Sequence, residues 1–295
     1  MRILNMGSLN LDRVYDVEHF VTPGETILAR GFGLFCGGKG LNQSVALARA
    51  GAQVYHAGAV GEEGEELLAL LRSAGADVSL VQKLPSATGH AIIQLEPGGQ
   101  NSIIVYGGAN QALTPEYIRQ VISHFGPGDL LLLQNETANV SCAIQAAKER
   151  GMLVAFNASP ITPELFRYPL QDVDYFLINE VEGRALAGAD SEAYEAVLDA
   201  LREKYEAAVV LTVGSEGAFY QKGDLRLHMG VYDVDVVDTT AAGDTFCGYF
   251  IASLARGMDP REALEYASRA SSLTVSRKGA ANSIPTWDEV ENFLN

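Results

Sequence analysis

The chain has 295 residues, of which 47% are hydrophobic and 20% are charged, so it can bury a large core and lacks the composition of a disordered protein. Its formal net charge of −16 argues against nucleic acid and anionic membrane as main partners, because a field of that sign repels both. Its three cysteines, Cys36, Cys142 and Cys247, are too few for a disulfide framework and have no metal-ligand spacing.

The beginning of the chain carries no sign of export. No apolar run approaches the ~18 residues that a membrane helix needs. The first twelve residues are interrupted by Asn5, Ser8 and Asn10, unlike a signal peptide. Together with the unpaired cysteines, these features predict a reduced, cytoplasmic, globular protein.

Short apolar runs alternate with helical patterns along the chain. Strands are predicted at residues 3–6, 54–60, 130–133, 153–156, 175–178 and 209–213. Helices are predicted at about 39–50, 63–74, 115–124, 139–150 and 191–205. Several of the strands are apolar at consecutive positions, which is typical of strands covered on both faces. The alternation predicts an α/β fold with a doubly wound, mainly parallel central sheet flanked by helices.

Two stretches, residues 11–36 and 88–106, interrupt this alternation with strand-like patterns. The second contains a Pro97-Gly98-Gly99 turn, and neither fits a crossover helix. We expect them to form a small antiparallel flap at one edge of the main sheet, a lid. The sequence has no internal repeat or long linker, so we expect one domain, residues 1–295, with the lid formed by insertions at about 11–36 and 88–106.

A first glycine-rich segment, Gly37 to Asn42, opens the helix predicted from residue 39. Glycines at a helix start let a ligand approach the backbone, and the free amides there attract oxygen-rich groups. Lys39 and Asn42 add further donors. The alternative is a tight turn with close packing of the helix on the sheet. The segment is not a Walker A loop, and no G-x-G-x-x-G follows the first strand, which disfavours a nicotinamide-dependent dehydrogenase.

A second segment, Asp238 to Phe246, precedes a helix whose Phe246, Phe250 and Leu254 form an apolar stripe. The first turn of that helix therefore lies near Ala242 to Asp244. Free amides there would form an anion hole for a transferring phosphoryl group, and a carboxylate could take the proton of an attacking hydroxyl. The alternative is that Asp244 only complements the helix dipole.

Two weaker signals follow predicted strands. Asn179 and Glu182, three residues apart at a strand end, could orient metal-bound water near phosphates, although Asn is also a common helix cap. The turn from Thr212 to Gly217 could border a flat ring.

Together these segments are much more specific than any one of them. The chain resembles the ribokinase-like sugar kinases, also called the phosphofructokinase-B family, over essentially its whole length. The resemblance also includes the segments Gly7 to Asp12, Thr22 to Thr26 and Arg277 to Ala280. Two positions depart from the family pattern: Ala241-Ala242 replaces a glycine-led start of the second signature, and Asn135 is an unusual neighbour of Glu136.

The resemblance implies a role for each matching residue. The implied sugar site consists of Asp12, Gly38, Lys39, Asn42, Glu136 and Asp244. Asp244 is the implied base, and the amides of Ala242 and Gly243 form the implied anion hole. The implied nucleotide contacts are Asn179, Thr212, Val213, Gly214, Ser215, Glu216, Gly217 and Ser268. Glu182 is implied to order Mg²⁺ through water. The implied monovalent-cation (K⁺) loop contains Asp238, Thr240, Thr274, Arg277, Gly279 and Ser283, which act largely through backbone carbonyls.

The implied reaction is phosphorylation of a sugar hydroxymethyl group by ATP, with O5 of D-ribose as the expected acceptor and D-ribose 5-phosphate as the product. A kinase for deoxyribose, a ketohexose or a nucleoside is the related alternative. A sugar-binding regulator without catalysis is an alternative of a different class. The expected partners are a small-molecule sugar and ATP, with neither nucleic acid nor membrane, and a homodimer could form through the lid. The sequence leaves open the exact sugar and the oligomeric state.

Overall fold

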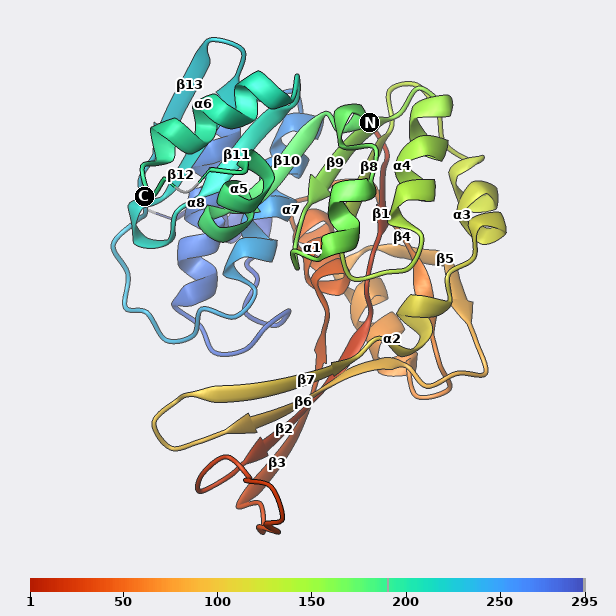
Figure 1. The fold of residues 1–295 in the computed structure, drawn as a ribbon, viewed down its shortest axis with the longest axis vertical. Coiled ribbons are helices and arrows are strands. Elements are labelled where there is room, and N and C mark those ends of the chain that lie inside the picture. Colours follow the sequence, from red (N-terminus) through yellow and green to blue (C-terminus); the bar gives the residue numbers. More distant parts are fainter. Residues whose placement is uncertain (190, 294–295) are drawn as a thin grey trace.

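The computed structural model describes residues 1–189 and 191–293, and a nine-stranded sheet forms its centre (Figure 1). The strand order is β13-β12-β11-β10-β9-β8-β1-β4-β5. The strands are β1 (Ile3–Met6), β4 (Val54–Val60), β5 (Asp77–Lys83), β8 (Leu130–Gln134), β9 (Leu153–Asn157), β10 (Tyr175–Asn179), β11 (Ala208–Thr212), β12 (Ala218–Lys222) and β13 (Leu225–Met229).

All neighbouring pairs from β11 to β5 are parallel, and only β12 and β13 add antiparallel pairings at one edge. This confirms the predicted mainly parallel sheet. The six predicted strands are present within one residue of their expected ends. β5, β12 and β13 were not predicted. β5 and β13 are half-exposed or exposed at every position, and the apolar run of β12 is only three residues long, Ala218 to Tyr220.

Helices cover both faces of the sheet. One face carries α1 (Lys39–Arg49), α2 (Glu65–Ala74), α7 (Ala242–Ala255), α8 (Pro260–Val275) and α9 (Trp287–Glu291). The other carries α3 (Pro115–Ile122), α4 (Val140–Glu149), α5 (Glu180–Ala187) and α6 (Tyr194–Lys204). Four short 3-10 turns lie at Gly108–Ala112, Pro163–Arg167, Leu170–Asp172 and Gly214–Glu216.

Residues of one strand alternate between the two cores. Leu131 and Leu133 of β8 pack against the α3–α6 side, whereas Leu130 and Leu132 pack against the α1–α7–α8 side, and all four are buried. This explains the unbroken apolar runs of the sequence, since a strand covered on both faces needs apolar side chains at every position.

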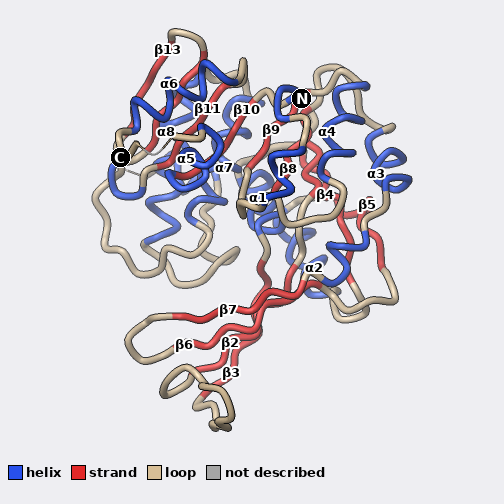
Figure 2. The backbone as a smooth tube through the Cα atoms, viewed as in Figure 1, coloured by secondary structure: helices blue, strands red, loops and turns tan. Residues whose placement is uncertain are grey.

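The lid is a separate four-stranded sheet with the order β3-β2-β6-β7. Its strands are β2 (Asn10–Asp16), β3 (Gly31–Gly37), β6 (Gly89–Leu95) and β7 (Asn101–Tyr106). The expected small antiparallel lid is confirmed, but it is a sheet of its own and not an addition to one edge of the main sheet. Two antiparallel hairpins are joined by a parallel pairing of β2 with β6, and the lid projects from the end of β1, inside the main sheet (Figures 1 and 2).

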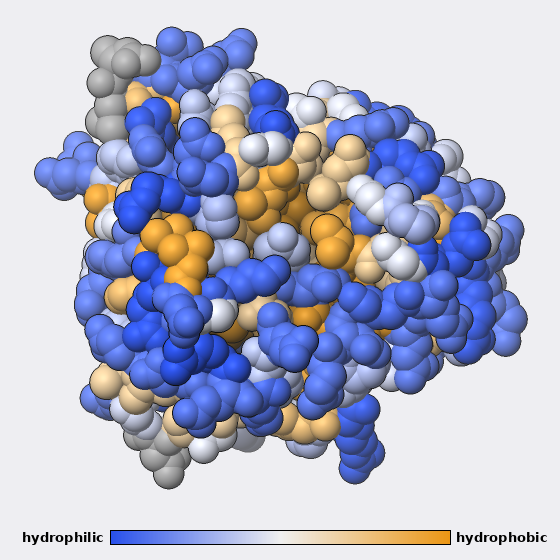
Figure 3. Space-filling model, turned by 90° about the horizontal axis from the view of Figure 1, so that it is seen from above, coloured by the Kyte–Doolittle hydropathy of each residue, from blue (hydrophilic) through white to orange (hydrophobic). Residues whose placement is uncertain are grey.

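The face of the molecule away from the lid is mostly hydrophilic, with apolar residues gathered around a central hollow (Figure 3). Among the described residues, no helix combines the length and the apolar character needed to cross a bilayer.

Candidate active site

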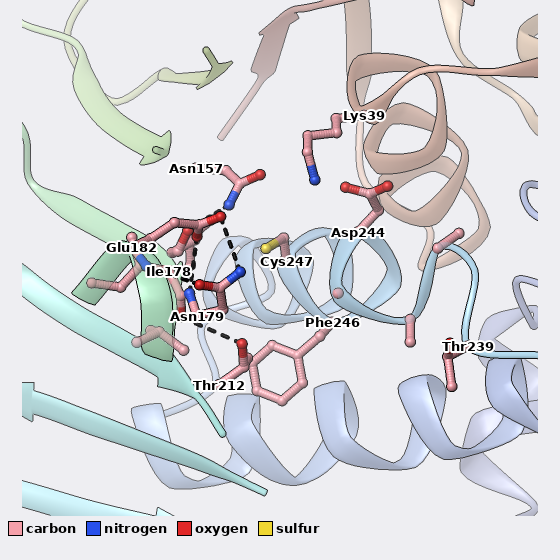
Figure 4. A pocket seen from close by; sticks show the side chains of 15 residues that line it. Lys39, Asn157, Ile178, Asn179, Glu182, Thr212, Thr239, Asp244, Phe246 and Cys247 are labelled. Carbon is pink, nitrogen blue, oxygen red and sulfur yellow. Dashed lines mark hydrogen bonds between the residues drawn. The ribbon is translucent and has the colours of Figure 1, made fainter. Parts of the chain in front are cut away.

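A pocket of about 240 Å³ lies where the carboxyl ends of the parallel strands meet the first turns of α1 and α7 (Figure 4). In a parallel α/β sheet this edge is the usual place for a ligand, because strand ends and helix N-termini converge there. The polar lining comes from six helices and strands and from the loop before α7, and it consists of Lys39, Asn157, Asn179, Glu182, Thr212, Thr239 and Asp244. Of the proposed nucleotide contacts, this lining includes Asn179 and Thr212 but not Val213, Gly214, Ser215, Glu216, Gly217 or Ser268.

The first glycine-rich segment serves both packing and ligand access. A Cβ on Gly40 would lie 2.4 Å from backbone atoms of Gly7 and Ser8, so only glycine lets α1 approach β1 this closely. Gly38, at the helix N-cap, has a φ of 96°, which strongly favours glycine. Close packing, the simpler of the two sequence interpretations, is therefore correct for Gly40. The same packing brings Lys39 into the pocket.

The N-terminus of α7 lies in the pocket wall. Ala241 is its N-cap with φ 60°, a left-handed conformation that glycine adopts at a lower cost than alanine. The amide of Ala242 donates to the carbonyl of Thr239 at 3.3 Å, a long bond. The amide of Gly243 belongs to the first helical turn, where no intrahelical acceptor exists.

The Asp244 carboxylate is 8% exposed and each of its oxygens accepts a hydrogen bond. Asn42 Nδ2 donates to Oδ2 and Gln43 Nε2 donates to Oδ1, both at 2.9 Å. Lys39 faces Asp244 across the pocket (Figure 4). The charge of Asp244, with that of Glu136, raises the pKa of the Lys39 ammonium, so this cation remains charged beside the carboxylate.

Two carboxyl groups, those of Asp12 and Glu136, lie near the base of the lid. Glu136 accepts hydrogen bonds from Ser8 Oγ and from the amide of Lys39, and burial raises the pKa of its carboxyl. Burial also raises the pKa of Asp12 to about 6, and the nearby Glu136 adds to this shift. A Cβ on Gly37 would lie 2.1 Å from Asp12 Oδ2, so a side chain there would displace the carboxylate.

Asn135, the unusual neighbour of Glu136, points away from this acidic pair. Its Nδ2 donates to the carbonyl of Pro160 at 2.6 Å, and its Oδ1 accepts from Tyr168 Oη at 3.0 Å. The residue therefore stabilises the loop after β9, and its identity does not alter the groups around Glu136.

Asn179 and Glu182 form a capping box at the start of α5. Glu182 accepts from the amide and from Nδ2 of Asn179, at 2.9 and 3.0 Å, and the Asn179 side chain accepts from the Glu182 amide at 2.9 Å. The pair thus caps a helix and also lines the pocket (Figure 4). Within the described ranges, no group of three His, Cys, Asp or Glu residues could hold a metal by itself.

The turn after Thr212 and the residue Ser268 serve local contacts. Glu216 accepts from Tyr194 Oη at 3.2 Å, and Gly217 has φ 96° beside the backbone of Met229. Ser268 donates to the carbonyl of Gly230 at 3.0 Å.

Asp238 joins the two segments of the expected cation loop. Its Oδ1 accepts from the amide and hydroxyl of Thr240 at 2.9 and 2.6 Å, and its Oδ2 accepts from the amide of Gly279 at 3.0 Å. Three other members of the loop use their side chains inside the protein: Thr274 donates to Ala270, Ser283 to Ala280 and Arg277 to Glu289. Backbone carbonyls are therefore the groups that these residues have left for an ion.

Sequence reasoning missed Gln43, Asn157 and Cys247. Asn157 is the last residue of β9, and its place directly after a buried run was a usable signal. Cys247 follows Asp244 by one helical turn, and burial raises the pKa of its thiol. Gln43 gave no signal, since a single amide inside a helix is usually solvated.

Comparison with known proteins agrees with this geometry. A family model described as pfkB family carbohydrate kinase matches residues 2–287. The chain is 37% identical to a ribokinase of Schizosaccharomyces pombe, over all of this chain and 98% of that protein. It is 35% identical to a ribokinase of Haemophilus influenzae, over 98% of this chain and 97% of that protein. The structure of Arabidopsis thaliana ribokinase complexed with ribose and ATP has a TM-score of 0.88 and 30% identity, over all of this chain and 98% of that one.

Proposed function

The chain belongs to the pfkB family of carbohydrate kinases, and we propose that within this family it transfers the γ-phosphoryl group of ATP to O5 of D-ribose. The products are D-ribose 5-phosphate and ADP. The observation that carries this proposal is the Asp244 carboxylate, held by two amides beside the N-terminal turn of α7 and facing an open pocket.

Asp244 is the base of the proposed reaction. It takes the proton of the sugar hydroxyl while O5 forms a bond to the γ-phosphorus and the bond to the bridging oxygen of ADP breaks. The amides of Gly243 and Ala242 form the anion hole, with Ala242 exchanging its long bond to Thr239 for a phosphoryl oxygen. Lys39 lies across the pocket and offsets the negative charge that develops there.

The sugar lies at the lid side of the same site, against Asp12, Gly38, Lys39, Asn42 and Glu136. Carboxylates and amides suit a polyhydroxylated ligand because each can accept or donate several hydrogen bonds. Oδ1 of Asn42 is buried and has no partner in the part of the chain that the structure describes, which supports a ligand hydroxyl as its donor. The lid excludes water, which otherwise would compete as the acceptor.

The nucleotide extends from the pocket past Asn179 and Thr212 toward Val213 to Gly217 and Ser268. The absence of these last residues from the pocket lining agrees with the size of about 240 Å³, which encloses the reacting groups rather than a whole nucleotide.

Two cations fit the donor groups of the proposed site. Mg²⁺ keeps several waters and binds phosphates, so one carboxylate such as Glu182, acting through water, is sufficient protein support. Backbone carbonyls of Asp238, Thr240, Thr274, Arg277, Gly279 and Ser283 suit K⁺, because the side chains of this loop are already engaged. When bound, Mg²⁺ would neutralise charge on the phosphates, and K⁺ would fix the conformation of the loop beside α7.

We also propose that the chain is one domain with lid insertions at about 11–36 and 88–106, and that two copies associate through the lids. Support for the dimer comes from large apolar side chains exposed on the lid strands, among them Phe35, Ile103 and Val105. The three cysteines are free, which supports a reduced compartment, the cytoplasm.

A coupled kinase assay with a panel of sugars tests this function. We expect ATP-dependent turnover with the highest kcat/KM on ribose, and a value roughly 10- to 100-fold lower on 2-deoxyribose, because the missing hydroxyl leaves buried polar groups unpaired. A higher kcat/KM on fructose, deoxyribose or a nucleoside would refute ribose as the preferred substrate, while the proposal of kinase activity would stand. Sugar binding without ATP turnover would instead support a non-catalytic regulator.

A further inference from the structure

A buried amide lies behind the Asp244 carboxylate. Gln43 on α1 donates to Asp244 Oδ1 at 2.9 Å, and its exposed fraction is 0%. A ligand in the pocket therefore cannot touch Gln43. Whatever this amide contributes to the reaction must act through the carboxylate that it holds.

Hydrogen bonds from the core fix which end of the Gln43 amide faces Asp244. Asn5 Nδ2 donates to the carbonyl of Gly40 at 2.8 Å, and a carbonyl can only accept. Asn5 Oδ1 is therefore the atom that accepts from Gln134 Nε2 at 2.9 Å. Gln134 Nε2 also donates to Gln43 Oε1 at 2.7 Å, which leaves Gln43 Nε2 for Asp244.

A second chain of contacts fixes the same orientation from β9. Asn157 Nδ2 donates to the carbonyl of Leu177 at 2.6 Å, so its Oδ1 is the atom 3.2 Å from Gln43 Nε2. Both hydrogens of this amide nitrogen then have acceptors, one on Asn157 and one on Asp244. A flipped amide would place two oxygens against each other at both contacts.

The other amide on Asp244, that of Asn42, is held less firmly. Its Oδ1 is buried without a partner among the described residues, so rotation of this side chain toward a sugar hydroxyl would gain a hydrogen bond. All polar groups of the Gln43 side chain already have partners, so its rotation would gain no hydrogen bond. It is the fixed partner of the carboxylate before and after a sugar binds.

We propose that Gln43 is a positioning residue for phosphoryl transfer, which holds the Asp244 carboxylate in one orientation. The inference rests on the proposed kinase activity with Asp244 as the base. An N–H donor favours the ionised carboxylate. The titratable groups around this part of the pocket are Lys39 of α1, Glu136 after β8, Glu182 of α5 and Cys247 of α7. Of these, only Lys39 supplies positive charge, and it faces the carboxylate across the pocket (Figure 4).

Gln43→Met tests the proposal because it keeps the length of the side chain and removes its donors. We expect kcat to fall about tenfold with the sugar KM within about twofold of wild type, and the acidic limb of kcat to move up by about one pH unit. In a crystal structure of the ligand-free variant, the Asp244 carboxylate should occupy more than one orientation, whereas the wild-type carboxylate keeps the one that Asn42 and Gln43 hold.

Ser44→Ala is the matched control. Ser44 is the next residue on α1, equally buried, and bonded at 2.8 Å to Asn5 and to His56, away from Asp244. It should lower the melting temperature and leave both the pH profile and the orientation of the Asp244 carboxylate unchanged. If Gln43→Met does not fold, Gln43→Glu keeps the shape and shares one proton with Asp244, which should raise the acidic limb further.

The two measurements separate this proposal from the proposed function. An unchanged Asp244 orientation in Gln43→Met, or an equal change in Ser44→Ala, overturns the positioning role. Wild-type protein that turns over no sugar overturns the proposed function, and the ligand-free structures still decide whether Gln43 orients this carboxylate.

Discussion

At the scale of single residues, the contacts of Asp244 predict how its replacement behaves. Asp244→Asn keeps the volume but cannot take a proton, and one of its oxygen positions becomes a nitrogen that opposes the amide of Asn42 or Gln43. We expect kcat to fall roughly 10²–10⁴-fold with a much smaller change in sugar affinity. Steady-state kinetics with calorimetric sugar binding measures both. Near-normal kcat would eliminate Asp244 as the base.

The raised pKa of Asp12 predicts that the stability of the fold depends on pH. Its folded pKa of about 6 lies above the ordinary value near 4, so the folded protein binds more protons between these values. Stability from this group is therefore lost as pH rises from about 4 to 6, and it stays lost above 6.

Asp12→Asn removes this dependence. At pH 8 the variant should be more stable than wild type by about 1 kcal/mol, a modest gain because the carboxyl is only half-buried. At pH 4 the two should be equal. The sugar KM should rise about tenfold, since a charged acceptor is lost. Parallel stability curves for the two proteins over pH 4–8 would contradict the prediction.

At the scale of elements, we expect alanine substitutions at two glycines near helix starts to change stability in opposite directions. Gly40→Ala places a methyl group 2.4 Å from the backbone of Gly7 and Ser8, directly after β1, so α1 must move and stability should fall by about 1–3 kcal/mol or more. Gly243→Ala meets no atom within 4 Å and should gain about 0.5–1 kcal/mol.

The kinetic effect of Gly243→Ala should be the reverse of its effect on stability. The added methyl group occupies pocket space at the anion hole, so kcat/KM should fall at least about tenfold in spite of the stable fold. Urea unfolding and kinetics on both variants check the pair. Full activity in Gly243→Ala would show that this helix start does not contact the phosphoryl group.

The cation loop makes a prediction about the N-terminus of α7. Asp238 ties the segment before α7 to the loop after α8, so an ion held by that loop should order the anion hole. Activity should rise severalfold when K⁺ replaces a large organic cation at constant ionic strength, which holds general screening fixed. Asp238→Ala should remove the response. Equal rates in both salts would rule out the assignment.

At the scale of the whole molecule, the register of the lid divides its exposed apolar side chains between two faces, and we place the second copy on the face that carries Ile103. Residues paired in register point to the same side, so Asp12, Ala91 and Val105 share one face, and Ile103 lies on it two residues further along. Ile104 points to the opposite face. Ile103 is 50% exposed and Ile104 is 63% exposed.

Ile103→Lys should convert the proposed dimer to monomers, because a charge would be buried between two apolar lid faces. Ile104→Lys is the control, with the same change on the other face, and it should leave the dimer intact. Analytical ultracentrifugation measures both. A wild-type monomer at all concentrations would refute association through the lid.

The sequence alone determined the features that depend on local free energy. Apolar runs located the main strands. Local residues also set helix ends, because Asp259 and Thr286 cap α8 and α9, and Gly51 and Gly257 have positive φ directly after α1 and α7. The apolar stripe beginning at Phe246 fixed the first turn of α7, and with it the location of Asp244. Each of these features involves residues within a few positions of one another, so a single stretch of sequence contains the whole signal.

Only the tertiary structure decided the contacts between distant segments. Gln43 and Asp244 are 201 positions apart, and Gln43 and Gln134 are 91 apart. The parallel pairing of β2 with β6 and the turning of Asn135 away from Glu136 are likewise set by neighbours elsewhere in the chain. The order of parallel strands determines which helix start meets which strand end. No local pattern encodes that order, because the strand order that forms is the one with the lowest free energy for both cores together.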